Sequence, residues 1–116
     1  MSAIERFYIR VDNLAAAEGE DSEFAFTGSS PASFAEQFQL GLRQRDLFKR
    51  WRDKQEDPDA VPDELSPCDP DATVEAHGSD LHTDVIVTTN LPHRVVAHRL
   101  TLLIGPQWTL RDVSKV

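Results

Sequence analysis

Residues 82–104 read HTDVIVTTNLPHRVVAHRLTLLI and dominate the prediction of the fold. The first part, 82–90, is rich in valine, isoleucine and threonine, which favour β-strands. The next residues, Asn90-Leu91-Pro92-His93, are of the types found in turns. In the second part, 94–104, alternation as in a strand would place on one face Val96, His98, Leu100, Leu102 and Ile104, which are apolar except for His98. The stretch therefore predicts two strands paired as a β-hairpin.

Four shorter segments also have the pattern of strands. Residues 4–12 alternate between two faces, with Phe7 and Ile9 on one side and Tyr8 on the other. Short runs of aromatic or β-branched residues mark the remaining three, which are 23–27, 72–77 and 107–113. Because strands joined by short turns usually pair antiparallel, we predict a mostly antiparallel sheet of about five to six short strands.

One long helix is predicted after the second of these strands. Phe34, Phe38 and Leu42 recur every four residues, as apolar positions do on one face of a helix. The apolar positions continue as far as Trp51, although the apolar face drifts around the helix. Gly41 lies within this run, where glycine weakens a helix by about 1 kcal/mol relative to alanine. A close backbone contact at Gly41 would explain its presence.

Two pairs of residues are candidates for the start of this helix. Ser33 and Glu36 fit a capping box, whereas Ser30 could cap a helix that has Pro31 at its first position. The predicted fold is α+β, with one domain spanning 1–116 and elements in the order β-β-α-β-β-β. The long helix packs on one face of the sheet. The other face is predicted to be solvated or covered by a second subunit.

The composition is that of one small folded domain. The chain has 116 residues, of which 40% are hydrophobic and 28% charged, both ordinary values for a globular domain. Its single cysteine, Cys68, excludes an intramolecular disulfide and fits a reducing compartment. The start of the chain lacks the pattern of a signal peptide, and the apolar run 102–104 is far too short to cross a membrane. We therefore expect a cytoplasmic protein that makes no membrane contact.

Residues 55–71, the acidic segment, differ in kind from the rest of the chain. They include seven acids, no bases and four prolines. Proline interrupts both helices and strands, like charges repel, and only Val61, Leu65 and Cys68 are candidates for burial. We predict a mobile loop. Its acids could fold back onto the basic residues 43–54 that precede it and screen them, order on a basic partner, mimic the phosphates of a nucleic acid, or act as a solvated tether.

Residues 43–54, the basic segment, directly precede the acidic one. The candidate binding residues in it are Arg43, Arg45, Lys49, Arg50, Trp51, Arg52 and Lys54. Such a patch is typical of a helix that contacts phosphates and stacks an aromatic ring on bases. It is equally typical of a protein interface anchored by an aromatic side chain. The alternative without a binding function is that the cations favour a helix C-terminus and the aromatic rings pack in the core.

Three residues near the start of 82–90 have the types that bind metals. Asp80, His82 and Asp84 would point to one side of a strand, and carboxylates with an imidazole can hold a divalent cation. No cysteine or second matched histidine completes the set, so we predict neither a metal nor a cofactor. No catalytic residue is predicted either. The serines before the helix match neither a P-loop nor a nucleophile elbow, and acids around Cys68 disfavour a thiolate.

These observations predict a non-enzymatic accessory or adaptor domain that binds another macromolecule. A protein partner is the first choice, and a homodimer is one form of it, because the predicted sheet has more apolar surface than one helix covers. The net charge of −8 disfavours broad contact with nucleic acid or anionic membranes. Nucleic-acid binding through the basic segment is therefore the alternative, and a small metal-dependent or other enzyme is third.

Overall fold

The computed structural model describes the chain except for residues 1–2, 15–16, 18, 20, 29 and 80. Its helices and strands are β1 (Glu5–Val11), α1 (Pro31–Arg43), α2 (Asp46–Asp53), β2 (Thr73–Gly78), β3 (Thr83–Thr89), α3 (His93–Ile104) and β4 (Trp108–Lys115). Two 3-10 helices, η2 (Pro58–Ala60) and η3 (Asp63–Leu65), lie between α2 and β2. The described residues therefore form an α+β fold with a four-stranded sheet and three α-helices.

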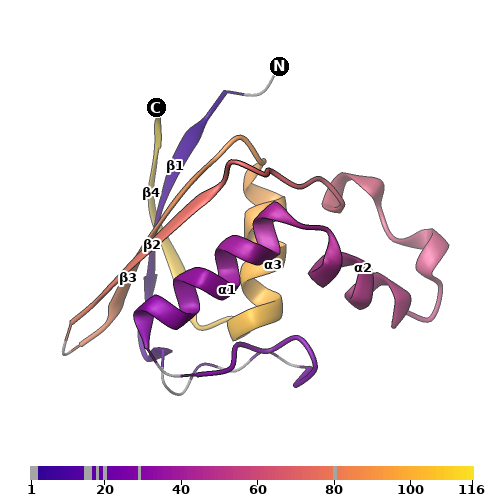
Figure 1. Cartoon of the computed structure of the whole chain (residues 1–116), viewed down its shortest axis with the longest axis horizontal. Helices are drawn as coiled ribbons and strands as arrows, with labels where there is room; N and C mark the ends of the chain where they lie inside the picture. Colours follow the sequence, from indigo (N-terminus) through magenta and orange to yellow (C-terminus); the bar gives the residue numbers. More distant parts are fainter. Residues whose placement is uncertain (1–2, 15–16, 18, 20, 29, 80) are drawn as a thin grey trace.

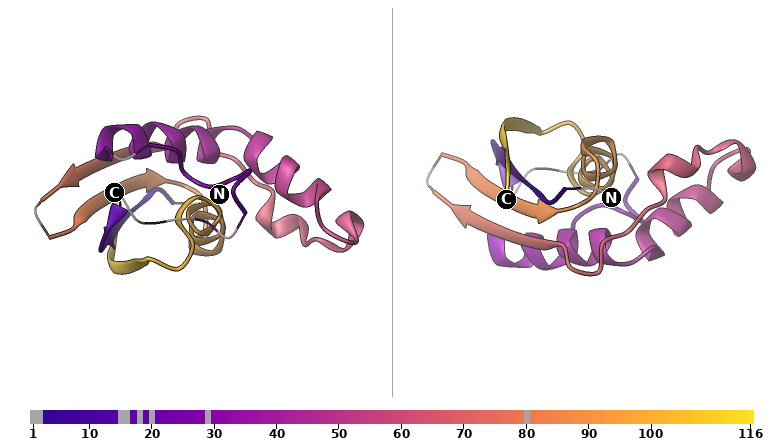
Figure 2. Two further views of the ribbon diagram at one scale, coloured as in Figure 1. Left: turned by 90° about the horizontal axis from the view of Figure 1, so that it is seen from below. Right: turned by 90° about the horizontal axis from the view of Figure 1, so that it is seen from above.

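The four strands form one sheet in the order β2-β3-β1-β4, and every neighbouring pair is antiparallel. Apart from α2, the chain follows the β-α-β-β-α-β connectivity of the ferredoxin-like, or split β-α-β, motif. The helices α1 and α3 lie on the same side of the sheet (Figure 1). α2 and the acidic segment lie at the end of the molecule opposite the tip of the β2–β3 hairpin (Figure 2).

The core lies between the sheet and the helices α1 and α3. Alternate strand residues are buried on this side, namely Phe7, Ile9 and Val11 on β1, Val85 and Val87 on β3, and Val74 on β2. The helices add Phe34, Phe38 and Leu42 from α1, and Val95, Val96, Leu100, Leu103 and Ile104 from α3. Removing these side chains from water is the main driving force for folding. The opposite face of the sheet is mostly polar, as an antiparallel sheet allows.

Four of the predicted strands are confirmed. The segments 4–12, 72–77, 82–90 and 107–113 correspond to β1, β2, β3 and β4, with bounds shifted by one or two residues. The predicted element order is wrong, because the other two predicted strands have different structures and the long helix is divided. Within the described part of the chain, no helix combines the length and the apolar character needed to cross a bilayer.

The segment predicted as a strand at 94–104 is the helix α3. Its buried residues are Val95 and Val96, Arg99 and Leu100, and Leu103 and Ile104. These pairs recur every four residues, which is a helical period. The helix follows Pro92 and ends at Gly105, whose φ of 66° is a conformation that glycine adopts without strain. The hairpin predicted within 82–104 is therefore wrong, and β3 pairs with β2 and β1 instead.

The strand predicted at 23–27 is an irregular turn. Phe24 and Phe26 are both buried, as their alternation indicated. The backbone, however, makes turn contacts, because the amide of Phe24 donates to the carbonyl of Asp21 at 3.0 Å. The amide of Phe26 donates to the carbonyl of Leu103, at the end of α3, at 2.8 Å. Two rings at alternate positions thus reach the core without any strand pairing.

The long helix predicted after this turn is two helices, α1 and α2. α1 ends at Arg43, and Gln44 has extended backbone dihedral angles. In one straight helix Leu47 would lie about 140° around the axis from Leu42, because each residue turns the chain by about 100°. The break redirects α2 so that Leu42 and Leu47 are both buried. The drift of the apolar face was therefore the sign of a break.

The start of α1 decides between the two predicted caps. The hydroxyl of Ser30 accepts a hydrogen bond from the backbone amide of Ser33 at 3.1 Å, and Pro31 holds the first helical position. This arrangement satisfies an amide that the first turn leaves free. The second predicted start is confirmed, and the capping box of Ser33 and Glu36 is not the one used.

Arg99 ties the acidic segment to the core. The side chain is fully buried and donates to the backbone carbonyls of Gly41, Leu65 and Pro67, with all three distances between 2.9 and 3.0 Å. The guanidinium thereby joins α3 to the end of α1 and to the residues around η3. Gly41 is also a point of close approach, since a Cβ there would lie 3.0 Å from Cδ2 of Leu47.

Asp69 forms a second anchor for the acidic segment. Its carboxylate, 5% exposed, accepts hydrogen bonds from the Thr89 hydroxyl at 2.8 Å and from the Asn90 amide at 3.1 Å. Burial alone would raise the pKa of Asp69, but hydrogen bonds outweigh it and the pKa is lowered. The residues predicted for burial, Val61, Leu65 and Cys68, are only half-buried. For residues 55–64, which precede the carbonyls that bind Arg99, mobility stays a prediction.

Candidate functional site

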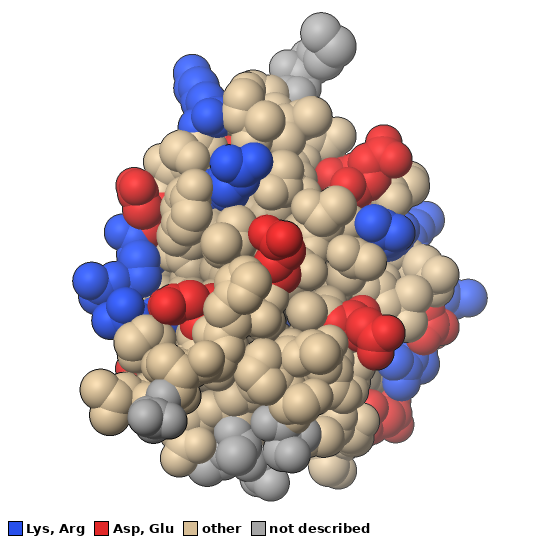
Figure 3. Space-filling model, turned by 60° about the vertical axis from the view of Figure 1, so that its left-hand side comes forward, with Lys and Arg blue, Asp and Glu red and all other residues tan. Residues whose placement is uncertain are grey.

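The face of the sheet that the helices leave uncovered is the open face. Its side chains form three rows across β4, β1, β3 and β2, which are Ser114-Arg6-Thr88-Thr73, Asp112-Tyr8-Ile86-Glu75 and Thr109-Arg10-Asp84-His77. From the side of the molecule where the strands lie, both signs of charge are visible with uncharged surface between them (Figure 3). The open face therefore has no strong field of one sign to attract a polyanion.

The middle row gives the open face an apolar centre. Tyr8 on β1 and Ile86 on β3 are paired in the sheet and are each half-buried. A shallow hollow of about 580 Å³ lies over them, lined by Arg6, Tyr8, Thr73, Glu75, Ile86 and Thr88. Nε of Arg6 donates to the hydroxyl of Thr88 at 3.4 Å at its margin. An apolar centre inside a polar rim is the arrangement found in protein–protein interfaces.

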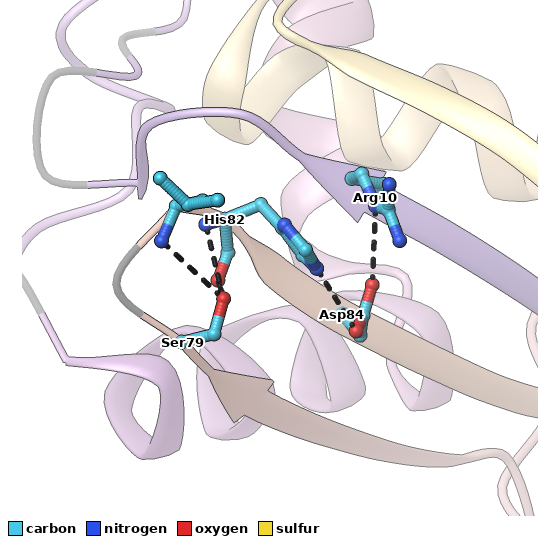
Figure 4. Close-up of polar contacts among 5 residues, drawn as sticks. Arg10, Ser79, His82 and Asp84 are labelled. Atoms are coloured by element: carbon cyan, nitrogen blue, oxygen red, sulfur yellow. Dashed lines mark hydrogen bonds and ion pairs between the residues drawn. The ribbon is translucent and has the colours of Figure 1, made fainter.

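The third row holds a small cluster of ionisable side chains. One carboxylate oxygen of Asp84 accepts from Nε of Arg10 at 3.4 Å, and the other lies 3.3 Å from Nε2 of His82 (Figure 4). The hairpin turn positions His82, because the hydroxyl of Ser79 accepts from the His82 amide at 3.2 Å and donates to its carbonyl at 3.0 Å. The cluster is half-exposed, so its pairs are worth little to stability.

Of the three candidate metal ligands predicted near 82–90, the structure brings two together. His82 and Asp84 lie in contact, whereas Asp80 lies outside the described residues. Arg10 places a fixed positive charge against Asp84, which opposes the binding of a cation there. Among the residues that the structure describes, no group of three histidine, cysteine or acidic side chains is placed to hold a metal ion.

The cations of the basic segment are largely engaged by the protein's own groups. Nε of Arg43 donates to the carbonyl of Ala72 at 2.7 Å. Lys54 lies 2.8 Å from the carboxylate of Asp21 and 3.6 Å from that of Glu23. The hydrogen bond to Asp21 is the largest cause of a raised pKa at Lys54.

Two arginines of α2 have acidic neighbours on the same helix. Arg50 pairs with Asp46 at 3.0 Å, and Arg52 lies 3.9 Å from Asp53. Arg45 and Lys49 are exposed, and no ion pair joins either to a residue of the described part of the chain. The basic segment thus presents less uncompensated charge than its composition indicates.

The acidic segment does not screen the basic one through the ion pairs that the structure describes. Glu64 pairs with Arg94 on α3 at 2.6 Å, outside the basic segment. The acids that contact the basic segment come instead from the turn at residues 21–23 and from α2 itself. None of the ion pairs in the described part of the chain joins the acidic segment to the basic one, so these pairs contradict the interpretation that the acidic segment folds back onto it.

Trp51 packs in part against the molecule itself. Its ring is half-buried and meets His98 edge-on, with 4.3 Å between ring centres. A hollow of about 1000 Å³ lies beside this pair, lined by Asp21, Ser22, Trp51, Gln55, His98, Thr101, Leu102, Gly105 and Pro106. Both ring nitrogens of His98 have less than 1 Å² exposed and no hydrogen-bond partner among the described residues. The imidazole therefore offers the hollow no accessible donor or acceptor.

Sequence reasoning predicted a face of the sheet without a helix, but it missed the pair of Tyr8 and Ile86 at the centre of that face. The alternation of 4–12 put Tyr8 on the outer side of the first strand, and the composition of 82–90 predicted a second strand. What the sequence did not predict was that these two strands are neighbours, which brings Tyr8 and Ile86 together. Searches against protein-family models, curated proteins and solved structures gave no match to the chain. The connectivity of the sheet by itself indicates no particular activity.

Proposed function

We propose that this chain is a non-enzymatic binding domain whose open face binds a protein partner. The observation that carries the proposal is the half-buried pair of Tyr8 and Ile86 at the centre of a polar, mixed-charge sheet face. Binding energy in protein interfaces is concentrated in such central aromatic and aliphatic anchors, and the polar rim excludes water around them.

The charge pattern indicates the kind of partner. Arg6 and Arg10 on the open face are interspersed with Glu75, Asp84 and Asp112. A partner with its own alternating charges can match this pattern, whereas a nucleic acid offers negative charge alone. A cytoplasmic location belongs to the same proposal, supported by the single cysteine of the chain.

The test removes the apolar centre without disturbing the helix side of the sheet. The variant is Tyr8→Ala with Ile86→Thr, because threonine keeps a β-branched residue in the central strand. The control is Leu40→Ala on α1, which removes a side chain that is 54% exposed on another surface. Each tagged protein is checked by circular dichroism and used to capture partners from cells that express the chain, with quantitative mass spectrometry as the readout.

We expect a defined partner to be recovered by the unmodified chain and by Leu40→Ala. The open-face variant should recover at least about tenfold less of it, which corresponds to about 1.4 kcal/mol of binding free energy. Equal recovery by a folded open-face variant would show that this face is not the binding surface. Recovery of no partner by any of the three proteins would count against the proposal itself.

A further inference from the structure

The two edges of the sheet differ in how they are protected. At the β2 edge, the side chain of Gln39 accepts from the amide of Val74 at 3.0 Å, and Arg43 donates to the carbonyl of Ala72. α1 packs along this strand. At the other edge, β4 pairs with β1 alone among the described strands. A long unprotected edge is a template for pairing with another strand.

A β-bulge gives β4 a symmetric arrangement of side chains. Leu110 pairs with Ile9 and Asp112 with Tyr8, so Arg111 is the extra residue of the bulge. Trp108, Leu110, Val113 and Lys115 pair with residues on the helix side of β1, and Thr109, Asp112 and Ser114 pair with residues on the open face. Alternation from Leu110 places Arg111 on the side of the open face as well. Counted outward from the midpoint between Arg111 and Asp112, the side chains therefore alternate between the open face and the helix side in the same sequence in both directions.

This symmetry allows β4 to pair with a copy of itself. An antiparallel pair about that midpoint matches Arg111 with Asp112, Leu110 with Val113, Thr109 with Ser114, and Trp108 with Lys115. Every matched pair lies on one face of the joined sheet. In a strand without the bulge the same register would place each pair on opposite faces. The match joins opposite charges at the centre, apolar side chains beside them, and hydroxyls beyond.

The backbone of β4 is available for this pairing. The amide of Val116 donates to the carbonyl of Ile4 at 3.1 Å, so by alternation the amides of Val113 and Lys115 point away from β1. The amide of Val113 is indeed held by its neighbour, because Oδ1 of Asp112 accepts from it at 2.9 Å. Val113 is itself 38% exposed at this edge. A second strand would accept the hydrogen bond of the Val113 amide, and the carboxylate of Asp112 could then pair with Arg111 of that strand.

We propose that β4 pairs antiparallel with β4 of a second copy of this chain, in the register that matches Arg111 with Asp112. Two sheets are then joined into one, and a closed two-fold dimer results. This inference goes beyond the proposed function, because it concerns the edge of the sheet and not the apolar centre of the open face. Either of the two can fail without the other.

The test is a charge exchange measured by sedimentation equilibrium of the full chain. Arg111→Asp creates two Asp–Asp pairs across the two-fold axis, and Asp112→Arg creates two Arg–Arg pairs. We expect each single change to raise the dimer dissociation constant by about tenfold or more, since like charges directly opposite each other repel. The double change Arg111→Asp with Asp112→Arg restores both attractive pairs, and its dissociation constant should return to within about threefold of the starting value.

Two controls alter the net charge by the same amounts elsewhere. Lys49→Asp on α2 matches Arg111→Asp, and Asp59→Arg in the acidic segment matches Asp112→Arg. Both should leave the dissociation constant unchanged. The proposal is overturned if the unmodified chain is a monomer at concentrations of about 100 μM, a weak limit for a specific dimer. It is equally overturned if a dimer ignores both single changes, or if the double change fails to restore it.

Discussion

His98 illustrates what one half-buried side chain with buried ring nitrogens can do to stability. It lies on α3 with its ring against Trp51 and Phe48, and neither ring nitrogen has a partner among the described residues. Burial, followed by the positive charge of Arg99, lowers the pKa of His98 to about 4. The imidazole is therefore neutral in the folded protein at neutral pH. It resists the proton that an unfolded histidine accepts near pH 6.5.

This shift predicts a loss of stability in mild acid. Between about pH 6.5 and pH 4 the unfolded chain binds a proton at His98 that the folded chain excludes. The free energy of unfolding should consequently be constant with respect to His98 above pH 6.5 and fall as the pH decreases through this window. His98→Phe should flatten the fall, as measured by urea unfolding at several pH values.

The control for this measurement is His77→Gln, which removes an exposed histidine from the open face. It should keep the pH dependence of the unmodified chain. The interpretation would be wrong if His98→Phe and His77→Gln lost stability to the same extent as the pH is lowered. Because the comparison is between variants, a general effect of acid on the carboxylates cancels.

Among the elements, α3 connects parts of the chain that lie far apart in the sequence. It packs on the sheet and contributes Arg99, which joins the end of α1 to residues 65–67 through three carbonyl acceptors. The hydrophobic surface of α3 alone would hold it against the core. The arginine adds a specific position for the acidic segment, which has little apolar surface of its own. One buried cation thus fixes the position of residues 65–67 in a segment that composition predicts to be mobile.

Replacing this cation should be costly. Arg99→Met keeps an unbranched side chain but removes the donor from the buried bond to Gly41 and from the part-buried bonds to Leu65 and Pro67, so we expect a loss of about 3 kcal/mol in the free energy of unfolding. Urea unfolding measures it. Arg94→Met, on the same helix, breaks only the exposed pair with Glu64 and should cost less than about 1 kcal/mol. Equal losses in the two variants would contradict this account.

The errors at the level of elements have physical causes. Along 94–104 seven of the eleven residues are apolar, at spacings that fit both a strand and a helix. The burial of Arg99 beside Leu100 shows which period the protein uses. Pro92 before the segment and Gly105 after it were the signals of a helix start and end. In 23–27, by contrast, nothing local distinguishes a strand from a turn that buries two rings.

The strands were predictable because their alternation is tied to one buried face. Phe7 and Ile9 on β1, like Val85 and Val87 on β3, are buried at every second position. The candidate site was not predictable in the same way. Tyr8 and Ile86 lie 78 positions apart in the sequence and become neighbours only through the strand order. The bulge at Arg111 likewise depends on how β4 is paired with β1.

At the scale of the whole molecule, the net charge of −8 and the internal pairing of the basic segment predict that duplex DNA is not a ligand. Titration of the full chain into a short duplex at low salt, followed by fluorescence anisotropy, should show no saturable binding. The alternative prediction would be supported by a complex that weakens steeply with salt and disappears in the variant Arg45→Glu with Lys49→Glu. Those two cations make no ion pair with the described residues.

The position of β1 between β3 and β4 has a consequence for how the protein is made. A ribosome produces β1 early and its two neighbouring strands only in the last third of the chain. Until then the apolar side of β1 has no strand beside it, and the nascent chain must keep Phe7, Ile9 and Val11 from other contacts. Such long-range pairing makes folding slow to begin, and it leaves a role for chaperones during synthesis.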